Sequence, residues 1–329
     1  MGELKIGKLP SELLRELVFD NIKEKNPKVL LGPEIGEDCA AVSFGDYACI
    51  LSTDPITGAE KGAGTLAIHI SCNDIASSGV KPIAIMITLL APPDTKKEEI
   101  DRVMKEAGEA ASELGVEIIG GHTEITAAVN KMVISTTALG KAEKDKVITT
   151  KGAKVGDDLV MTKWAGLEGT SIIASDKEEE LKEILTPEEI EEAQELIKYI
   201  SVVPEGVLAG EFGVNSMHDV TEGGIFGAVW EVAEVSGTGV EIYSDAIPIK
   251  EVTKKICDHY GLDPYGLIAS GTMIITCNKG DAFVEVLEKN GIKATVIGKI
   301  IEKERHVIGG NGVKAILEPP KSDELFKIV

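Results

Sequence analysis

The spacing of hydrophobic residues changes along the chain between a helical period and a strand period, which predicts a mixture of helices and strands. Amphipathic spacing near 3.6 residues indicates helices, and short apolar runs bounded by turn residues indicate strands. In the first half the predicted helices are 11–25, 65–79 and 95–114. The predicted strands of that half are 46–53, 83–90, 116–119 and 131–139.

A stretch of turn residues at 150–158 separates this half from a second one. The second half opens with an acidic helical tract and then mixes helices with strands. Its predicted helices are 176–200, 204–213, 224–235, 249–260 and 280–290, and its predicted strands are 272–276 and 294–301, followed by a hairpin around 309–312. Helices and strands that do not alternate regularly predict an α+β fold with two α/β domains, 1–152 and 153–329.

Composition and net charge indicate which classes of binding partner the protein is unsuited to. The chain has 329 residues, 43% of them hydrophobic and 27% charged, as in ordinary globular proteins. Its formal charge of −21 argues against nucleic acids and anionic membranes, because both need a basic surface. No apolar run reaches the length of a membrane span, and charges occupy the N-terminal stretch where a signal peptide is apolar. We therefore expect a cytoplasmic protein.

The predicted helix 65–79 carries an unusual acidic residue. Most of its residues are apolar or small on every face, which predicts burial, yet Asp74 lies within it. A buried carboxylate is costly unless it is paired, protonated or bound to a metal. A structural salt bridge is the alternative explanation for Asp74 considered alone.

Further acidic and glycine-rich segments occur at the ends of other predicted elements. Asp38 lies at a loop-to-strand junction and Asp54 follows an apolar strand. Polar residues with two glycines follow the strand 116–119, and a second such group precedes the helix at 224–235. Each could be a simple turn. Together, and without a lysine-bearing phosphate loop, they suggest metal ions that bridge carboxylates to a polyphosphate.

These segments resemble, in order and over essentially the whole chain, the motifs of the aminoimidazole ribonucleotide (AIR) synthase superfamily. The segments that carry the resemblance are IGEDCAAV, LSTDPIT, NDIASSGVKP, GVEIIGGHTEIT and HDVTEGGIFGAVWEVA. The overall pattern looks most like the hydrogenase expression/formation protein E (carbamoyl dehydratase) branch. Thiamin-monophosphate kinase and selenophosphate synthetase belong to the same superfamily.

The resemblance implies an N-terminal domain that forms a homodimer through its sheet, and a C-terminal α/β domain that binds nucleotide. It implies that ATP and Mg²⁺ lie in a cleft between the domains. Transferred position by position, the implied metal ligands are Asp38, Asp54, Asp74 and Asp219. The residues implied to line ATP are Asn73, Gly120, Gly121, Thr123, Thr221, Gly223 and Gly224.

The chemistry implied by the resemblance is phosphorylation, and so activation, of an amide-type oxygen of a small substrate. Two departures bear on it. The family's usual Gly-Asp-Thr is Gly-His-Thr-Glu here, so His122 and Glu124 become candidates for a catalytic or metal-binding role. The hydrogenase-maturation branch carries its substrate on a C-terminal cysteine, and no cysteine follows Cys277 in this sequence.

Two other functions therefore remain open. One is an inactive ATP-binding accessory protein that docks to a maturation partner, and the other is a small-molecule kinase like thiamin-monophosphate kinase.

Overall fold

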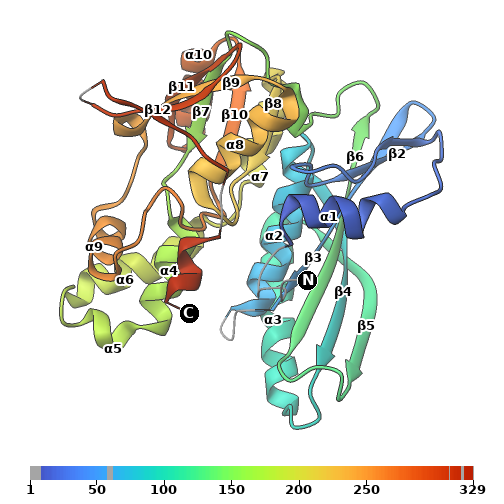
Figure 1. Ribbon diagram of the computed structural model, residues 1–329. Helices are drawn as coiled ribbons and strands as arrows, with labels where there is room; N and C mark the ends of the chain where they lie inside the picture. Colours follow the sequence, from blue (N-terminus) through green and yellow to red (C-terminus); the bar gives the residue numbers. More distant parts are fainter. Residues whose placement is uncertain (1–8, 58–61, 311, 320–321, 329) are drawn as a thin grey trace.

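The computed structural model describes residues 9–57, 62–310, 312–319 and 322–328, and it forms two sheet-containing halves that lie side by side (Figure 1). Within these residues no helix combines the length and apolarity that a membrane span needs. The predicted α+β fold with two sheet domains is confirmed.

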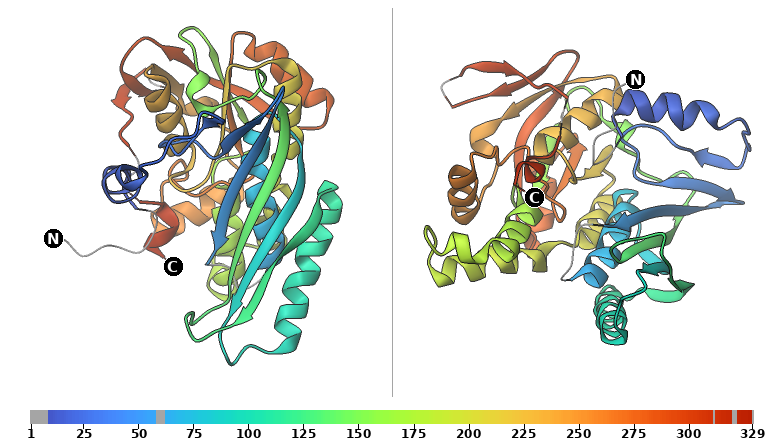
Figure 2. Two further views of the ribbon diagram at one scale, coloured as in Figure 1. Left: turned by 90° about the vertical axis from the view of Figure 1, so that its right-hand side faces the viewer. Right: turned by 60° about the horizontal axis from the view of Figure 1, so that its bottom comes forward.

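The first half is a six-stranded sheet covered on one face by two helices. The strands have the order β1-β2-β3-β6-β4-β5. Their bounds are β1 Val29–Leu31, β2 Ala40–Phe44, β3 Tyr47–Ile56, β4 Pro82–Ala91, β5 Glu117–Ile125 and β6 Val133–Glu143. The helices are α1 Ser11–Leu17, α2 Ala63–Ser77 and α3 Lys97–Leu114. Helices α2 and α3 lie together on one side of the sheet, as Figure 1 and the right-hand view of Figure 2 show.

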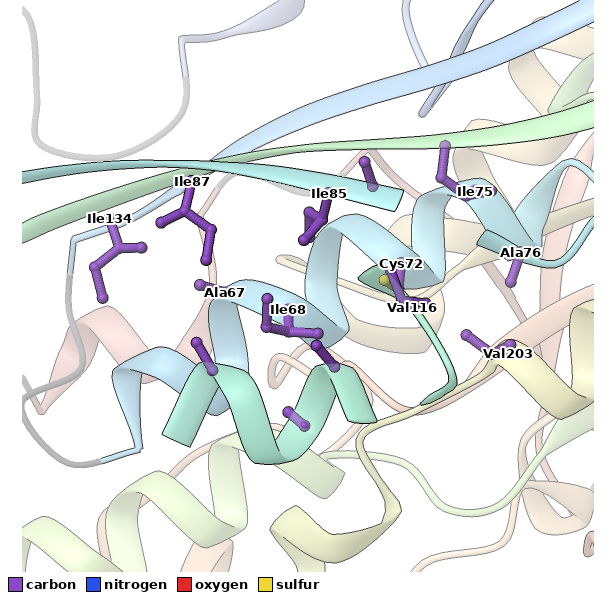
Figure 3. Close-up of a cluster of buried hydrophobic side chains, with 14 of the residues drawn as sticks. Ala67, Ile68, Cys72, Ile75, Ala76, Ile85, Ile87, Val116, Ile134 and Val203 are labelled. Carbon is purple, nitrogen blue, oxygen red and sulfur yellow. The ribbon is translucent and has the colours of Figure 1, made fainter. Parts of the chain in front are cut away.

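The core of this half lies between the sheet and helix α2. Figure 3 shows Ile85 and Ile87 of β4 directed toward α2 and Ile75 of α2 close to the sheet, whereas Ile68 and Cys72 lie on the side of the helix away from β4, Cys72 beside Val116. Nearly every residue of α2 is buried, because the sheet covers one side and helices α3 and α7 (Val203–Phe212) cover others. The predicted burial of this helix on most faces is thus observed, and Asp74 is buried with it.

The second half has a seven-stranded sheet with helices on both faces. Its strands have the order β13-β12-β9-β11-β7-β10-β8. Their bounds are β7 Asp158–Thr162, β8 Ser216–Asp219, β9 Gly239–Tyr243, β10 Met273–Cys277, β11 Ala294–Ile301, β12 Arg305–Ile308 and β13 Lys314–Ile316. The further helices are α4 Leu167–Asp176, α5 Glu178–Leu181, α6 Pro187–Glu195, α8 Gly224–Ser236, α9 Glu251–Tyr260 and α10 Gly280–Lys289. Helix α8 packs on one face, and α7 and α10 pack on the other.

The two halves are joined where α2 crosses α7. Glycines make this crossing close: a Cβ at Gly206 would lie 2.2 Å from the carbonyl oxygen of Ala76, and one at Gly210 would lie 2.3 Å from that of Gly79. The side chain of Asn73 adds a polar link. Its amide nitrogen donates to the carbonyl of Ile200 at 2.8 Å, and its oxygen accepts from the N–H of Val202 at 2.8 Å. The position of α2 is therefore fixed by the second half.

Three predicted elements differ clearly from the structure. The acidic helix expected at 176–200 is divided into α5, α6 and a short 3₁₀ turn at Leu196–Tyr199. The helix expected at 11–25 ends at Leu17, followed by a short 3₁₀ turn at Phe19–Asn21. Leu17, Val18 and Ile22 are exposed, so these side chains make little tertiary contact that would stabilise a longer helix. The strand expected to end at residue 119 continues to Ile125, because pairing with β4 extends through both glycines. The hairpin near 309–312 is observed as β12–β13.

Candidate functional site

Four acidic side chains from distant parts of the sequence meet at the junction of the two halves. Asp38 precedes β2, Asp54 lies in β3, Asp74 lies in α2 and Asp219 ends β8. The Ser52 hydroxyl donates to Asp54 Oδ2 at 3.1 Å and also to Asp74 Oδ2. Asp74 is also close enough to Asp38 and Asp219 for both to raise its pKa. The carboxylates thus form one cluster.

The environment of Asp74 disfavours the ionised form of its carboxyl group. Burial raises the pKa of its carboxyl well above the ordinary value, and repulsion from Asp219, Asp54 and Asp38 raises it further. A cation held among these oxygens would relieve that repulsion, since opposite charge favours the ionised form. The donor set is oxygen-rich, as hard divalent cations such as Mg²⁺ require, so the residues present fit the cation implied by the sequence.

A histidine that the sequence analysis gave no role belongs to this cluster. His218 Nδ1 lies 2.8 Å from Asp38 Oδ2, and its Nε2 lies 2.9 Å from Oε2 of Glu231 in α8. Burial alone would lower the pKa of His218, but the two carboxylates outweigh it and raise the pKa well above its usual value. Ligand atoms of Asp38, His218 and Asp219 all lie within 4.8 Å of one another. The sequence feature that could have indicated a role for His218 is its position directly before Asp219.

The glycine-rich turn before α8 is in place but already has an anionic partner. Thr221, Gly223 and Gly224 follow Asp219 directly and lead into the helix. The N–H of Gly223 donates to Oδ2 of Asp323 at 2.7 Å, so a carboxylate of the same chain lies at the helix N-terminus. A Cβ at Gly224 would lie 2.5 Å from the carbonyl oxygen of Tyr265, so close packing explains this glycine.

Beside this turn lies a buried acid that sequence reasoning missed. Glu168, at the start of α4, is 6% exposed, and its Oε2 has no hydrogen-bond partner among the described residues. The pKa of its carboxyl is raised to about 7, mainly by burial. A hydrogen bond from Ser270 lowers the pKa, and repulsion from Glu222 and Asp323 raises it. Glu168 is therefore largely protonated below neutral pH.

Replacing Glu168 with glutamine is expected to make stability less dependent on pH. With a folded-state pKa of about 7 against an ordinary 4.5, the unfolded chain releases this proton first. The wild type therefore loses stability as pH rises through that window, by about 3 kcal/mol in total. Urea unfolding should find the Glu168→Gln variant more stable than the wild type at pH 8 and nearly equal at pH 5. An equal difference at both pH values would contradict this.

The other glycine segment that the sequence analysis singled out, residues 120–124, lies far from the four aspartates of the same chain. Strand pairing places Asp54 opposite Thr136, Thr136 opposite Ile87, and Ile87 opposite Gly121. Gly121 is thus three strands from Asp54, about 14 Å at the usual strand spacing. Five of the candidate site residues are exposed to solvent on the edge strand β5, namely Gly120, Gly121, His122, Thr123 and Glu124. His122 Nε2 lies 3.2 Å from Glu124 Oε2, so these two side chains pair with each other.

Asn73 also has a different environment from the one expected. It was expected to line a nucleotide, but it is fully buried, and both ends of its amide bond to the backbone at residues 200–202. Its place beside Asp74 in α2 means that it holds the helix, and so Asp74, against the second half.

Comparison with known proteins agrees with this architecture. Residues 36–142 match the family model "AIR synthase related protein, N-terminal domain", and residues 154–311 match the corresponding C-terminal domain. A putative hydrogenase expression/formation protein of Methanocaldococcus jannaschii is 29% identical over 98% of this chain and 97% of its own. Carbamoyl dehydratase HypE of Cupriavidus necator is 25% identical over 94% of this chain and 87% of its own.

Solved structures show the same fold. A chain from a HypE–HypF complex superposes with a TM-score of 0.77 at 21% identity, covering 94% of this chain and 99% of the other. HypE in complex with ATP superposes with a TM-score of 0.69 at 21% identity, covering 97% of each chain. At these identities the likeness concerns the fold. With both domain models matched in order across two sheet domains, the chain belongs to the AIR synthase related family.

Proposed function

We propose that this protein is an ATP- and Mg²⁺-dependent enzyme that phosphorylates an amide-type oxygen of its substrate and so activates that oxygen to leave. The observation that carries the proposal is the convergence of Asp38, Asp54, Asp74 and Asp219 at the junction of the two domains. The kinship with carbamoyl dehydratases, and the ATP complex of a HypE of the same fold, support the choice of nucleotide and reaction.

The four carboxylates would hold Mg²⁺, which would neutralise the charge of a triphosphate and of the group being transferred. The residues of this chain supply position rather than a covalent nucleophile. Ser52 holds Asp54 and Asp74 in a fixed mutual orientation, and Asn73 fixes the helix that carries Asp74. Phosphoryl transfer depends mainly on such positioning and on charge stabilisation.

The proposed reaction balances without any further reactant. The amide oxygen bonds to the terminal phosphorus of ATP as the bond to the ADP oxygen breaks. The phosphorylated oxygen then leaves as phosphate while the amide nitrogen loses its two protons, one to the departing phosphate and one to water, and a carbon–nitrogen triple bond results. A simple kinase would stop after the first step. Product analysis therefore separates the two, because the kinase leaves a phosphorylated product and no free phosphate.

Isothermal calorimetry tests the proposal most simply. Titration of ATP into the protein with Mg²⁺ present is expected to give a binding heat that disappears when a chelator removes the metal. Absence of binding with Mg²⁺ present would reject both the enzyme and the inactive ATP-binding accessory protein. Phosphate release that depends on an added amide would exclude the accessory role.

We further propose that two copies of the chain pair through the open face and edge of the first sheet. Ile83 and Met86 of β4 and Ile119 of β5 are each about half exposed there, although they are large and apolar. Such a surface is costly in water unless a partner covers it. Pairing would also give Gly120–Glu124 of one copy access to a neighbour's surface.

Light scattering is expected to give about twice the chain mass of 34.9 kDa. The Met86→Glu variant is expected to shift the population to monomer, because a charge would be buried in the interface. Val155→Glu, at a similarly exposed position of the second half, is the matched control and should leave the mass unchanged. A monomeric wild type would overturn the pairing.

A further inference from the structure

His218 occupies a position among the carboxylates that oxygen-only binding of Mg²⁺ does not need. It is 4% exposed, its ring lies between Asp38 of the first domain and Glu231 of α8, and both ring nitrogens face carboxylate oxygens. Asp54 and Asp74, linked through Ser52, form the other part of the cluster and bring no nitrogen. The cluster therefore has an oxygen part and a mixed nitrogen and oxygen part.

We infer that Asp38, His218 and Asp219 form a cation subsite that binds a divalent transition-metal ion in preference to Mg²⁺, with His218 Nδ1 as the ligand that sets this preference. The inference rests on the proposed function and deepens it, because it divides the cation site by ligand chemistry. Imidazole nitrogen favours transition metals, whereas carboxylate oxygen alone also suits Mg²⁺.

The geometry around the ring supports ligation through Nδ1. A histidine that binds a metal through one nitrogen almost always donates the N–H of the other to a carboxylate or carbonyl, and Glu231 is placed for that at 2.9 Å from Nε2. With Nε2 carrying the hydrogen, the lone pair of Nδ1 faces Asp38 Oδ2, which is itself an acceptor. In the metal-free chain a proton on Nδ1 joins the two atoms, and a bound metal ion would replace that proton.

The distance between these atoms suits a metal ion as well as a proton. Neighbouring ligands of a six-coordinate ion with bonds of about 2.1 Å are about 3 Å apart. His218 Nδ1 and Asp38 Oδ2 are 2.8 Å apart. The carboxylate of Asp219 lies within the same 4.8 Å group and supplies a third ligand atom.

Cobalt(II) is the discriminating probe, because it resembles Mg²⁺ in charge and octahedral size but binds nitrogen more strongly. The metal-free full chain would be titrated with Co²⁺ and followed by visible absorption, with Mg²⁺ affinity measured by competition. The wild type is expected to bind Co²⁺ at least about tenfold more tightly than Mg²⁺. His218→Gln is expected to weaken Co²⁺ about 10- to 100-fold and Mg²⁺ by less than about threefold. The visible band should change as the nitrogen ligand is lost.

Two further variants make the result decisive. His259→Gln, a histidine on α9 in the second domain, is expected to leave Co²⁺ binding unchanged. Glu231→Gln keeps the His218 ring but weakens the bond to Nε2, and is expected to lose several-fold in Co²⁺ affinity. Circular dichroism verifies that each variant is folded. The inference is overturned if His218→Gln leaves Co²⁺ affinity unchanged, or if it weakens both ions equally.

Failure here and failure of the proposed function are distinguishable. The cobalt titration uses no nucleotide, whereas the proposed function is decided by calorimetry with ATP and Mg²⁺. A chain that binds ATP with Mg²⁺ but shows no histidine-dependent cobalt preference keeps the proposed function and loses this subsite.

Discussion

Replacing Asp74 with asparagine is expected to reduce ATP turnover by at least about 100-fold while leaving the fold intact. Burial and three neighbouring carboxylates raise the pKa of Asp74, so without a cation its charged form is disfavoured and a neutral amide of the same shape replaces it at little cost. The amide cannot supply the charge that holds a cation against a triphosphate. Loss of one such electrostatic contribution typically costs two to three orders of magnitude in turnover, roughly.

Phosphate release measured with saturating ATP, Mg²⁺ and substrate tests this, with thermal unfolding as the check on the fold. Asp219→Asn is expected to behave in the same way, because Asp219 belongs to the same cluster. Asp101→Asn, on the exposed side of α3, is the matched control. Wild-type turnover in both the Asp74 and Asp219 variants would remove the cluster from the reaction.

Replacing Lys163 with methionine is expected to cost about 3 to 5 kcal/mol of folding stability, the largest single loss anticipated in this chain. Lys163 Nζ lies 2.6 Å from Glu205 Oε1, and it donates to the carbonyls of Tyr199, Ser201 and Gly271 at 2.6 to 3.0 Å. Methionine fills similar space but leaves the buried Glu205 carboxylate without its counter-charge.

The double variant Lys163→Met with Glu205→Leu separates the two causes. Removing both charges abolishes the uncompensated carboxylate, so at least half of the lost stability is expected to return. Urea unfolding at pH 7 measures both variants. If the single variant loses less than 1 kcal/mol, roughly, the ion pair is not a stabilising centre. The effect also bears on function, because Lys163 orders the segment to which Asn73 is bonded.

Elements with strong local patterns could be predicted from the sequence. Helix α2 was found because its apolar residues surround it, and α3 because its apolar residues lie on one stripe and Gly115 ends it. The N-terminal helix was predicted too long because its apolar residues indicated a packing surface that the fold does not use. The strand β5 was predicted too short because glycines usually break strands, whereas pairing with β4 carries the chain through Gly120 and Gly121.

The candidate site could be predicted only in part. Asp74 could be predicted as a site residue because an acidic side chain is unusual in a helix whose other residues are mostly apolar or small. The partners of Asp74 and His218 were not predictable from spacing, because Ser52, Glu231 and Asp38 are brought to them by tertiary packing. The same holds for Asp323, which meets Gly223 from a distant part of the chain. Lys163 gave no signal, since a single lysine after a strand is ordinary.

The most direct test of the central claim is the position of bound metal and nucleotide in a crystal of the full chain. Crystals grown with Mn²⁺ and a nonhydrolysable ATP analogue would be measured at the manganese absorption edge. The expected result is anomalous density among Asp38, Asp54, Asp74 and Asp219, with the phosphates of the analogue in contact with it. Nucleotide bound elsewhere, or manganese absent from these carboxylates, would contradict the account.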